Sequence, residues 1–130
     1  MTDDDGEETF ELALIKEVLG VRESAVLEWA SAFKLTTMAC SVSSRQAAIL
    51  GAVLTMKKHS PGKAGELRPL LLQLLAYDGP DDDWVVVRRV RSKPQIERPP
   101  VRVDVTSSLK ARPVIYDPMS FLDQLRQLSS

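Results

Sequence analysis

The residues of this chain with the clearest chemical potential are the arginines and lysines that crowd residues 84–112. Residues 1–40 have the opposite balance, with nine acids and three bases. Guanidinium and ammonium groups neutralise phosphates, so a basic stretch predicts either a nucleic-acid surface or a contact with an acidic protein surface. A solvated basic strand pair is the equally simple alternative. Against Glu97 and Asp104, the stretch holds eight bases: Arg88, Arg89, Arg91, Lys93, Arg98, Arg102, Lys110 and Arg112.

Catalytic and metal-binding chemistry has little support in the sequence. Cys40 and His59 are the single cysteine and histidine, too few for a disulfide framework or a protein-only zinc site. The aspartates at 81–83 lack the glycine and the further carboxylate of a calcium loop, and they fit a turn. No glycine-rich phosphate loop, nucleophile elbow or acid–base pair occurs. We therefore predict a non-enzymatic protein that needs no cofactor and no metal.

Length and composition are those of one small domain. The 130 residues are 44% hydrophobic and 27% charged, which is ordinary for a globular domain. No apolar run approaches the roughly 18 residues that a membrane span needs. The opening MTDDDGEE is acidic, unlike the basic start of a signal peptide, so we expect a cytoplasmic location. Residues 1–8 are expected to form a disordered acidic tail.

The first half of the chain begins with the spacing of two short helices. Thr9 can cap a first helix whose apolar residues recur every three or four positions until Gly20 ends it. A second helix is predicted from about Arg22 to Phe33, with its apolar stripe including Trp29. A short link over residues 34–42 then leads to the next element.

Two further helices complete a predicted helical domain over residues 9–78. Ser43 or Ser44 can cap a third helix that is apolar almost all round, as a central helix is. A fourth helix follows over about residues 65–77, with Pro69 either in its first turn or at its start. The turn DGPDDD marks the boundary of the domain. Its predicted core is Leu12, Ile15, Val18, Val26, Trp29, Phe33, Ile49, Leu50, Val53, Leu54, Leu71 and Leu74.

From residue 84 the pattern changes from helical to extended. WVVVRRV, VRVDVT and PVIY are typical of short strands, and the prolines between them confine such strands to edges. Alternation along the first strand sends Arg88 to one face and Arg89 and Arg91 to the other. Because both faces then carry charge, we predict a small basic β appendage over residues 84–116.

Residues 117–130 are predicted to form a short amphipathic helix. Asp117 can cap it, and Pro118 suits its first position. A small sheet interrupted by prolines is marginal alone, so this helix must cover something. Either it docks on a partner, including a second copy in a homo-oligomer, or it closes the protein's own core. Its single apolar stripe is Phe121, Leu122, Leu125 and Leu128.

LIKEVLGVRESAVLEWASAFKL and SSRQAAILGAVLTMKKHSPGKAGELRPLLLQL resemble the MerR-like winged helix-turn-helix domain over about residues 10–75. In that family a Gly-Val turn, here Gly20-Val21, joins the first two helices, and Trp29 matches a tryptophan that packs under the recognition helix. The resemblance implies a mainly α fold with a helix-turn-helix four-helix N-terminal domain, and DNA binding in transcription regulation. The family's arginine and tyrosine before the tryptophan are replaced by Leu27 and Glu28, and TTMACSV stands where its basic wing would be.

Two functions follow from these patterns. The first is non-enzymatic DNA binding by a winged-helix-type fold. The alternative is a protein-interaction or self-assembly module whose helix-turn-helix frame no longer reads DNA, which the acids of the second helix favour. The nucleic-acid contacts would be Arg22, Lys57, Lys58, Arg88, Arg89, Arg91, Lys93 and Arg102. The partner contacts would be Leu27, Phe121, Leu122, Leu125 and Leu128.

Overall fold

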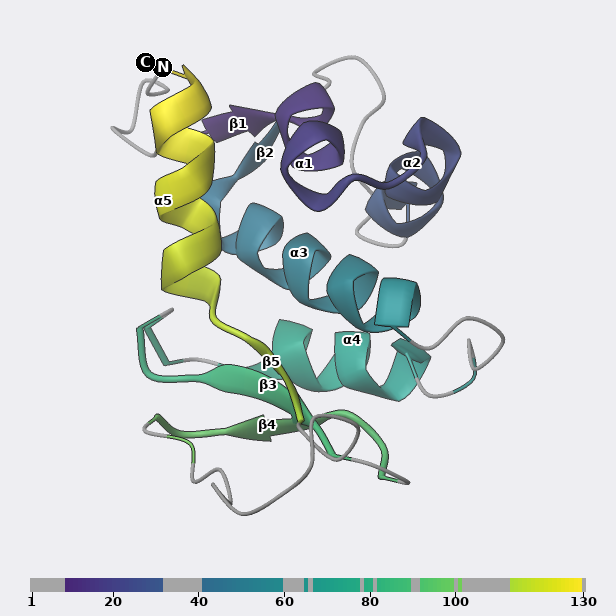
Figure 1. Cartoon of the computed structure of the whole chain (residues 1–130), viewed down its shortest axis with the longest axis vertical. Helices are drawn as coiled ribbons and strands as arrows, with labels where there is room; N and C mark the ends of the chain where they lie inside the picture. Colours follow the sequence, from purple (N-terminus) through teal and green to yellow (C-terminus); the bar gives the residue numbers. More distant parts are fainter. Residues whose placement is uncertain are drawn as a thin grey trace.

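Helices dominate the fold, and two small antiparallel sheets complete it (Figure 1). The computed structural model describes residues 9–31, 41–59, 65, 67–77, 79–80, 82–89, 92–99, 101 and 113–129. Within these ranges, every helix is too short or too polar to span a lipid bilayer. The helices are α1 (Leu12–Leu19), α2 (Glu23–Ser31), α3 (Ser44–His59), α4 (Leu67–Ala76) and α5 (Pro118–Ser129).

The chain enters its first helix from a strand. Strand β1 (Thr9–Glu11) pairs antiparallel with β2 (Ser41–Ser43), which places Phe10 opposite Val42, and both of these side chains are buried. The predictions that Thr9 caps the first helix and that residues 34–42 are only a link were therefore wrong. The burial of Phe10 explains why a strand forms here. Pairing of β1 with β2 removes this apolar side chain from water, whereas a capping residue at the start of a helix would leave it exposed.

Helix α3 is the centre of the molecule, as its all-round apolar sequence predicted. The other four helices all pack against it, and its residues 47–54 are buried. Two reciprocal hydrogen bonds cap its N-terminus. The backbone amide of Gln46 donates to Ser43 Oγ at 3.2 Å, and the backbone amide of Ser43 donates to Gln46 Oε1 at 3.1 Å. The Arg45 guanidinium donates to the carbonyl of Tyr77, which ties the start of α3 to the end of α4.

The second sheet is part of the same core as the helices. Strand β3 (Val85–Arg88) lies between β4 (Gln95–Glu97) and β5 (Val114–Tyr116). Trp84, Val86 and Tyr116 belong to one hydrophobic cluster with α3, so the described strands of the predicted β appendage pack on the helices. Strand β5 confirms the prediction for PVIY, whereas β4 was not predicted. The strand expected over VRVDVT lies outside the described residues, except for its first valine.

Helix α5 begins as predicted but covers the protein's own core. The Met119 amide donates to Asp117 Oδ1 at 3.0 Å, which is the expected cap. Phe121, Leu122 and Leu125 are buried against the rest of the chain, which agrees with the alternative that the helix closes the protein's own core. Their assignment as partner contacts was therefore wrong. The physical reason is that α5 follows β5 almost directly, and β5 is already fixed to β3 beside α3.

Candidate interaction surfaces

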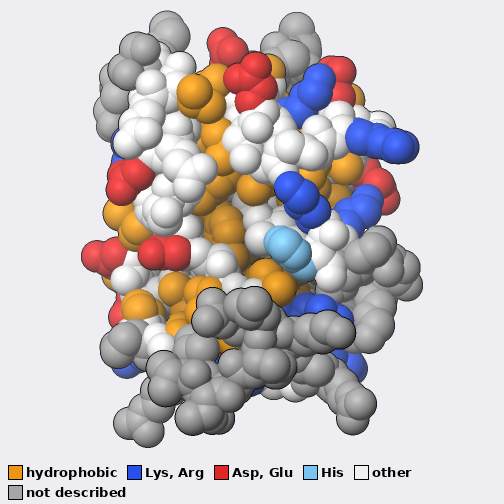
Figure 2. All heavy atoms as spheres, viewed as in Figure 1, with side chains coloured by type: hydrophobic (Ala, Val, Ile, Leu, Met, Phe, Trp, Pro, Cys, Tyr) orange, Lys and Arg blue, Asp and Glu red, His pale blue; other side chains and the backbone are white. Residues whose placement is uncertain are grey.

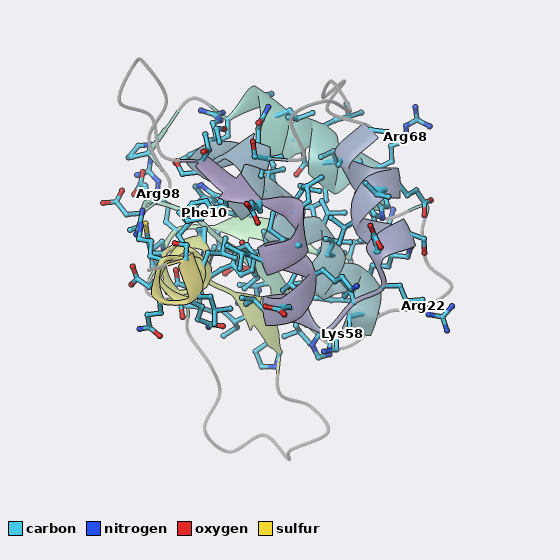
Figure 3. The ribbon with its side chains drawn as sticks, turned by 90° about the horizontal axis from the view of Figure 1, so that it is seen from above. Phe10, Arg22, Lys58, Arg68 and Arg98 are labelled. Atoms are coloured by element: carbon cyan, nitrogen blue, oxygen red, sulfur yellow. The ribbon has the colours of Figure 1, made fainter. Side chains whose placement is uncertain are left out.

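Three of the cations predicted to contact nucleic acid line one hollow at the turn between α1 and α2. The hollow measures about 540 Å³ and takes Arg22 from the turn and Lys57 and Lys58 from the last turn of α3. Gly20 ends α1 with a φ of 64°, a conformation that glycine adopts without strain, and so redirects the chain into α2. Figure 3 shows Arg22 and Lys58 at the same edge of the molecule.

Both lysines of this hollow already have partners within the chain. The Lys58 ammonium donates to the carbonyl of Leu19 at 3.0 Å, where a cation also suits the C-terminal end of the α1 dipole. The Lys57 ammonium lies 3.5 Å from the Glu28 carboxylate. Arg22 is exposed, and among the described residues its guanidinium has no ion-pair or hydrogen-bond partner. Figure 2 shows lysine and arginine side chains gathered over α2 and the end of α3, with acidic side chains among them.

Two arginines of the basic stretch after residue 84 form ion pairs with carboxylates of the same chain. The Arg89 guanidinium makes a paired contact with the Glu97 carboxylate, with Nη2 donating to Oε1 at 3.1 Å, and this joins β3 to β4. The hydrogen bond from Arg89 lowers the pKa of Glu97, and the bond to Glu97 raises the pKa of Arg89. Arg98 lies 4.0 Å from Asp83. Both arginines are therefore paired with carboxylates of the protein itself.

Of the other predicted cations of the stretch, the structure describes two, Arg88 and Lys93. Arg88 is half-buried, and its Nε is buried without a hydrogen-bond partner. Lys93 is exposed between β3 and β4. Arg91 and Arg102 lie outside the described residues. The described part of the stretch thus offers no continuous row of exposed bases that a phosphate backbone could follow.

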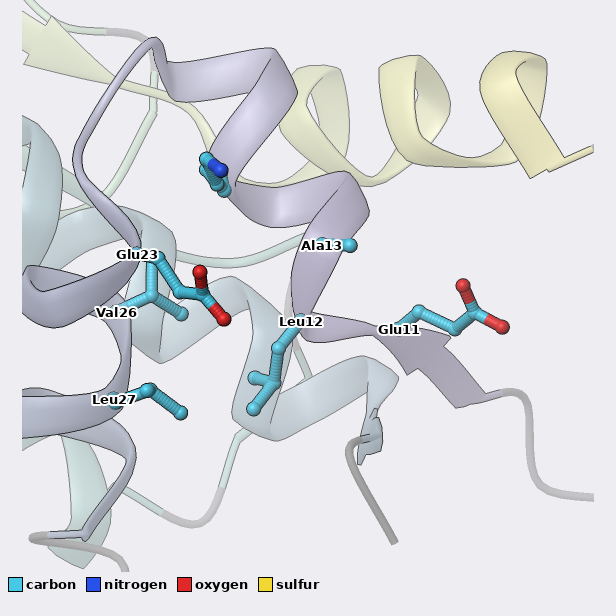
Figure 4. Close-up of a pocket in the computed structure, with 7 residues that line it drawn as sticks. Glu11, Leu12, Ala13, Glu23, Val26 and Leu27 are labelled. Atoms are coloured by element: carbon cyan, nitrogen blue, oxygen red, sulfur yellow. The ribbon is translucent and has the colours of Figure 1, made fainter.

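A second hollow, of about 470 Å³, lies between α1 and α2 (Figure 4). Leu27 of α2 is 50% exposed beside it. Figure 4 shows Leu12 and Leu27 pointing toward each other across the hollow, with the carboxylate of Glu23 turned into it and that of Glu11 turned away. Val26 is buried beneath. The predicted partner residue Leu27 therefore faces an apolar floor with an acidic rim.

A third hollow, which the sequence patterns did not predict, lies between α2 and α4. It measures about 330 Å³ and is lined by Glu28, Trp29 and Arg68 with leucines of α4. Leu72 and Leu75 are 60% and 41% exposed there. Trp29 was predicted to be a core residue, and it is only partly buried. Its indole Nε1 is buried and has no hydrogen-bond partner among the residues that the structure describes.

The sequence did contain a signal for this third surface. Helix α4 holds six leucines in ten residues, which is more than one buried face needs. The buried set follows the one-face spacing of i, i+3, i+4 and i+7, and it leaves Leu72 and Leu75 outside that stripe. The four buried leucines are Leu67, Leu70, Leu71 and Leu74.

The C-terminal stripe leaves one residue at the surface. Leu128 is 53% exposed and borders a shallow hollow beside β1. A single exposed leucine is ordinary on a protein surface. The exposed apolar stripe on which the prediction of self-association through residues 117–130 rested is therefore not present.

Metal chemistry gains no support from the geometry. In the part of the chain that the structure describes, no group of three or more histidine, cysteine, aspartate or glutamate side chains is placed to hold a metal ion. No protein-family model, curated protein or solved structure matches this chain.

Proposed function

We propose that this chain is a non-catalytic protein-interaction module whose partner surface is the groove between α1 and α2. The observation that carries the proposal is the half-exposed Leu27, which faces Leu12 across a hollow above the buried Val26. An apolar anchor of a partner that enters this hollow would cover Leu27 and exclude water from both walls. Buried anchors of this kind dominate the energy of protein interfaces.

Charge around the groove favours a partner with a cation beside its apolar anchor. Glu11 and Glu23 line the hollow against one base, Lys16. The Glu23 carboxylate is turned into the hollow, where a partner's lysine or arginine would reach it. The lack of an internal disulfide favours action in the reducing cytoplasm, where such a module would meet its partners.

A pair of matched variants tests the proposal. Leu27→Ser and Leu128→Ser each remove a leucine that is about half exposed, so each should change the free energy of unfolding by less than about 0.5 kcal/mol. In affinity capture from the source cells, the proteins retained by the wild type should also be retained by Leu128→Ser and lost with Leu27→Ser. Equal retention by both variants would place the partner surface elsewhere.

Duplex DNA is the second candidate ligand, and it would give the protein a role in transcription. The convergence of Arg22, Lys57 and Lys58 in one hollow before α2 favours it. In a helix-turn-helix protein this end of the second helix approaches the duplex, and cations there can neutralise backbone phosphates. Glu28 lines the same hollow and opposes such an approach, which is why the protein-interaction proposal comes first.

A salt series separates the two candidates. Binding to generic duplex should weaken as salt rises, and alanine at Arg22 should reduce the slope of log affinity against log salt by about one unit. Arg68→Ala is the matched control, because Arg68 is exposed, is not among the predicted contacts and lines the hollow between α2 and α4 instead. No binding to duplex at low salt would exclude the DNA candidate, and it would leave the protein-interaction proposal untouched.

A further inference from the structure

We infer that the exposed face of α4, together with Trp29, binds an acidic amphipathic helix of a partner protein. This surface lies on the α4 side of α2 and uses residues other than those of the α1–α2 groove, apart from the shared helix α2. Its three components are an apolar stripe, an aromatic wall and one cation without a partner.

The apolar part fits a helix laid across it. Leu72 and Leu75 are one turn apart on α4 and are both exposed. Trp29 and the buried Leu71 continue the same hollow toward α2. Apolar side chains one turn apart on a partner helix, at i and i+3 or i+4, could enter between Trp29 and the leucines, as in helix-in-groove recognition.

The charge of the hollow selects an acidic partner. Arg68 is the second residue of α4 and is exposed, and its guanidinium has no ion-pair or hydrogen-bond partner among the residues that the structure describes. A cation in the first turn is opposed by the helix dipole, so the free chain gains nothing from this position. Glu28, the other charged residue of the hollow, lies 3.5 Å from Lys57 and is balanced by it. A carboxylate near one end of the partner helix would give Arg68 its missing counter-ion.

A second copy of the chain fits this face less well than a peptide does. A stable dimer buries about 800 Å² on each partner, whereas this face offers two partly exposed leucines and one side of an indole. Each copy would also bring its own Arg68, which adds a like charge to the contact. One amphipathic helix supplies both the apolar side chains and the opposite charge.

The test uses the full chain and two synthetic helical peptides. Both peptides carry leucines at i, i+3 and i+7, and their flanking charges are glutamates in one and lysines in the other. The indole N–H signal of Trp29, assigned against Trp84 with a Trp29→Phe variant, reports on the hollow by NMR. The glutamate peptide should shift this signal and leave that of the buried Trp84 in place. It should bind at least about tenfold more tightly than the lysine peptide.

Three variants locate the binding. Leu72→Ser combined with Leu75→Ser should abolish the shift, and Leu128→Ser should leave it unchanged. Arg68→Glu should reverse the preference, so that the lysine peptide binds more tightly. Equal affinity for both peptides, or no shift at about 1 mM of the glutamate peptide, overturns the inference.

Two other outcomes assign the surface differently, and both also overturn the inference. Self-association that Leu72→Ser and Leu75→Ser abolish would make this face a contact between copies. Loss of peptide binding in Leu27→Ser, with the α4 variant unaffected, would move the peptide into the α1–α2 groove. The second outcome supports the proposed function, so the two ideas can fail separately.

Discussion

Helices α4 and α5 are both rich in leucine and both pack on α3, yet they expose very different surfaces. Helix α5 spaces its apolar side chains on one stripe, and Phe121, Leu122 and Leu125 of that stripe are buried in the protein's own core. Helix α4 buries a complete stripe as well, and still presents Leu72 and Leu75 to solvent. A single clean stripe is thus what a helix needs to close its own fold. Leucines beyond that stripe are the better sign of a surface for another molecule.

The largest effect that tests this comparison is expected at Phe121. Its ring is buried and lies 5.8 Å from the ring of Tyr116, centroid to centroid. Phe121→Ala should lower the free energy of unfolding by about 3–5 kcal/mol, since it leaves a cavity between α5 and α3. Leu72→Ala on α4 is the matched change and should cost less than about 0.5 kcal/mol. Denaturant unfolding measures both, and similar losses would erase the distinction between the two helices.

A smaller loss is expected at Gly51, where α3 packs against Phe121 of α5. A Cβ added at Gly51 would lie 2.6 Å from the ring of Phe121 and would also meet the hydroxyl of Tyr116. That hydroxyl is held in place, because it donates to the carbonyl of Ala48 at 2.6 Å. Gly51→Ala should therefore destabilise the protein by about 1–3 kcal/mol through overpacking, although alanine is the better helix former. An increase in the midpoint of thermal unfolding would show that α5 can move away from α3.

The cap of α5 should contribute less again. Asp117→Ala removes the carboxylate that accepts from the Met119 amide, and it should cost about 1 kcal/mol. The control is Asp123→Ala, which removes only an exposed pair with Arg126 one turn away and should cost about 0.5 kcal/mol or less. Chemical denaturation of both variants gives the comparison. Equal losses would mean that α5 is held by its packing alone.

The smallest effect concerns the sheet that packs beneath α4, and it depends on pH. Arg89 lowers the pKa of Glu97 in the folded chain, so this pair adds stability above the ordinary pKa of a glutamate, about 4.3. The contribution is lost as the pH falls through the lower pKa of the folded state. Glu97→Gln should therefore reduce stability near neutral pH and leave a shallower decline between about pH 5 and pH 3. Unfolding curves across this range measure it, and parallel declines for wild type and variant would contradict the pairing.

Local spacing determined most of the helical structure of this protein. The turn at Gly20 and the cap at Asp117 were predicted from neighbouring residues, and the structure has both. For the cap of α3 and the place of Pro69 the sequence left two alternatives each, and the structure has Ser43 as the cap and Pro69 in the first turn of α4. Capping and helical periodicity are set by groups within about four residues of one another, so one sequence is enough to find them. The same argument placed Leu27 outside the apolar stripe of α2, where it is exposed.

Contacts between distant segments decided the rest. Three-residue strands such as β1 and β4 are too short to show an alternating pattern in the sequence. The residues around Phe10 also give no indication that it pairs with Val42. The apolar stripe of α5 likewise does not show which surface the helix will cover. The pairing of β5 with β3 places α5 on α3, so the stripe is buried there. The candidate surfaces have the same origin, because each of these three hollows is formed where helices pack together. Arg22 meets Lys57, and Trp29 meets Leu72, only after α3 and α4 have packed against the first two helices.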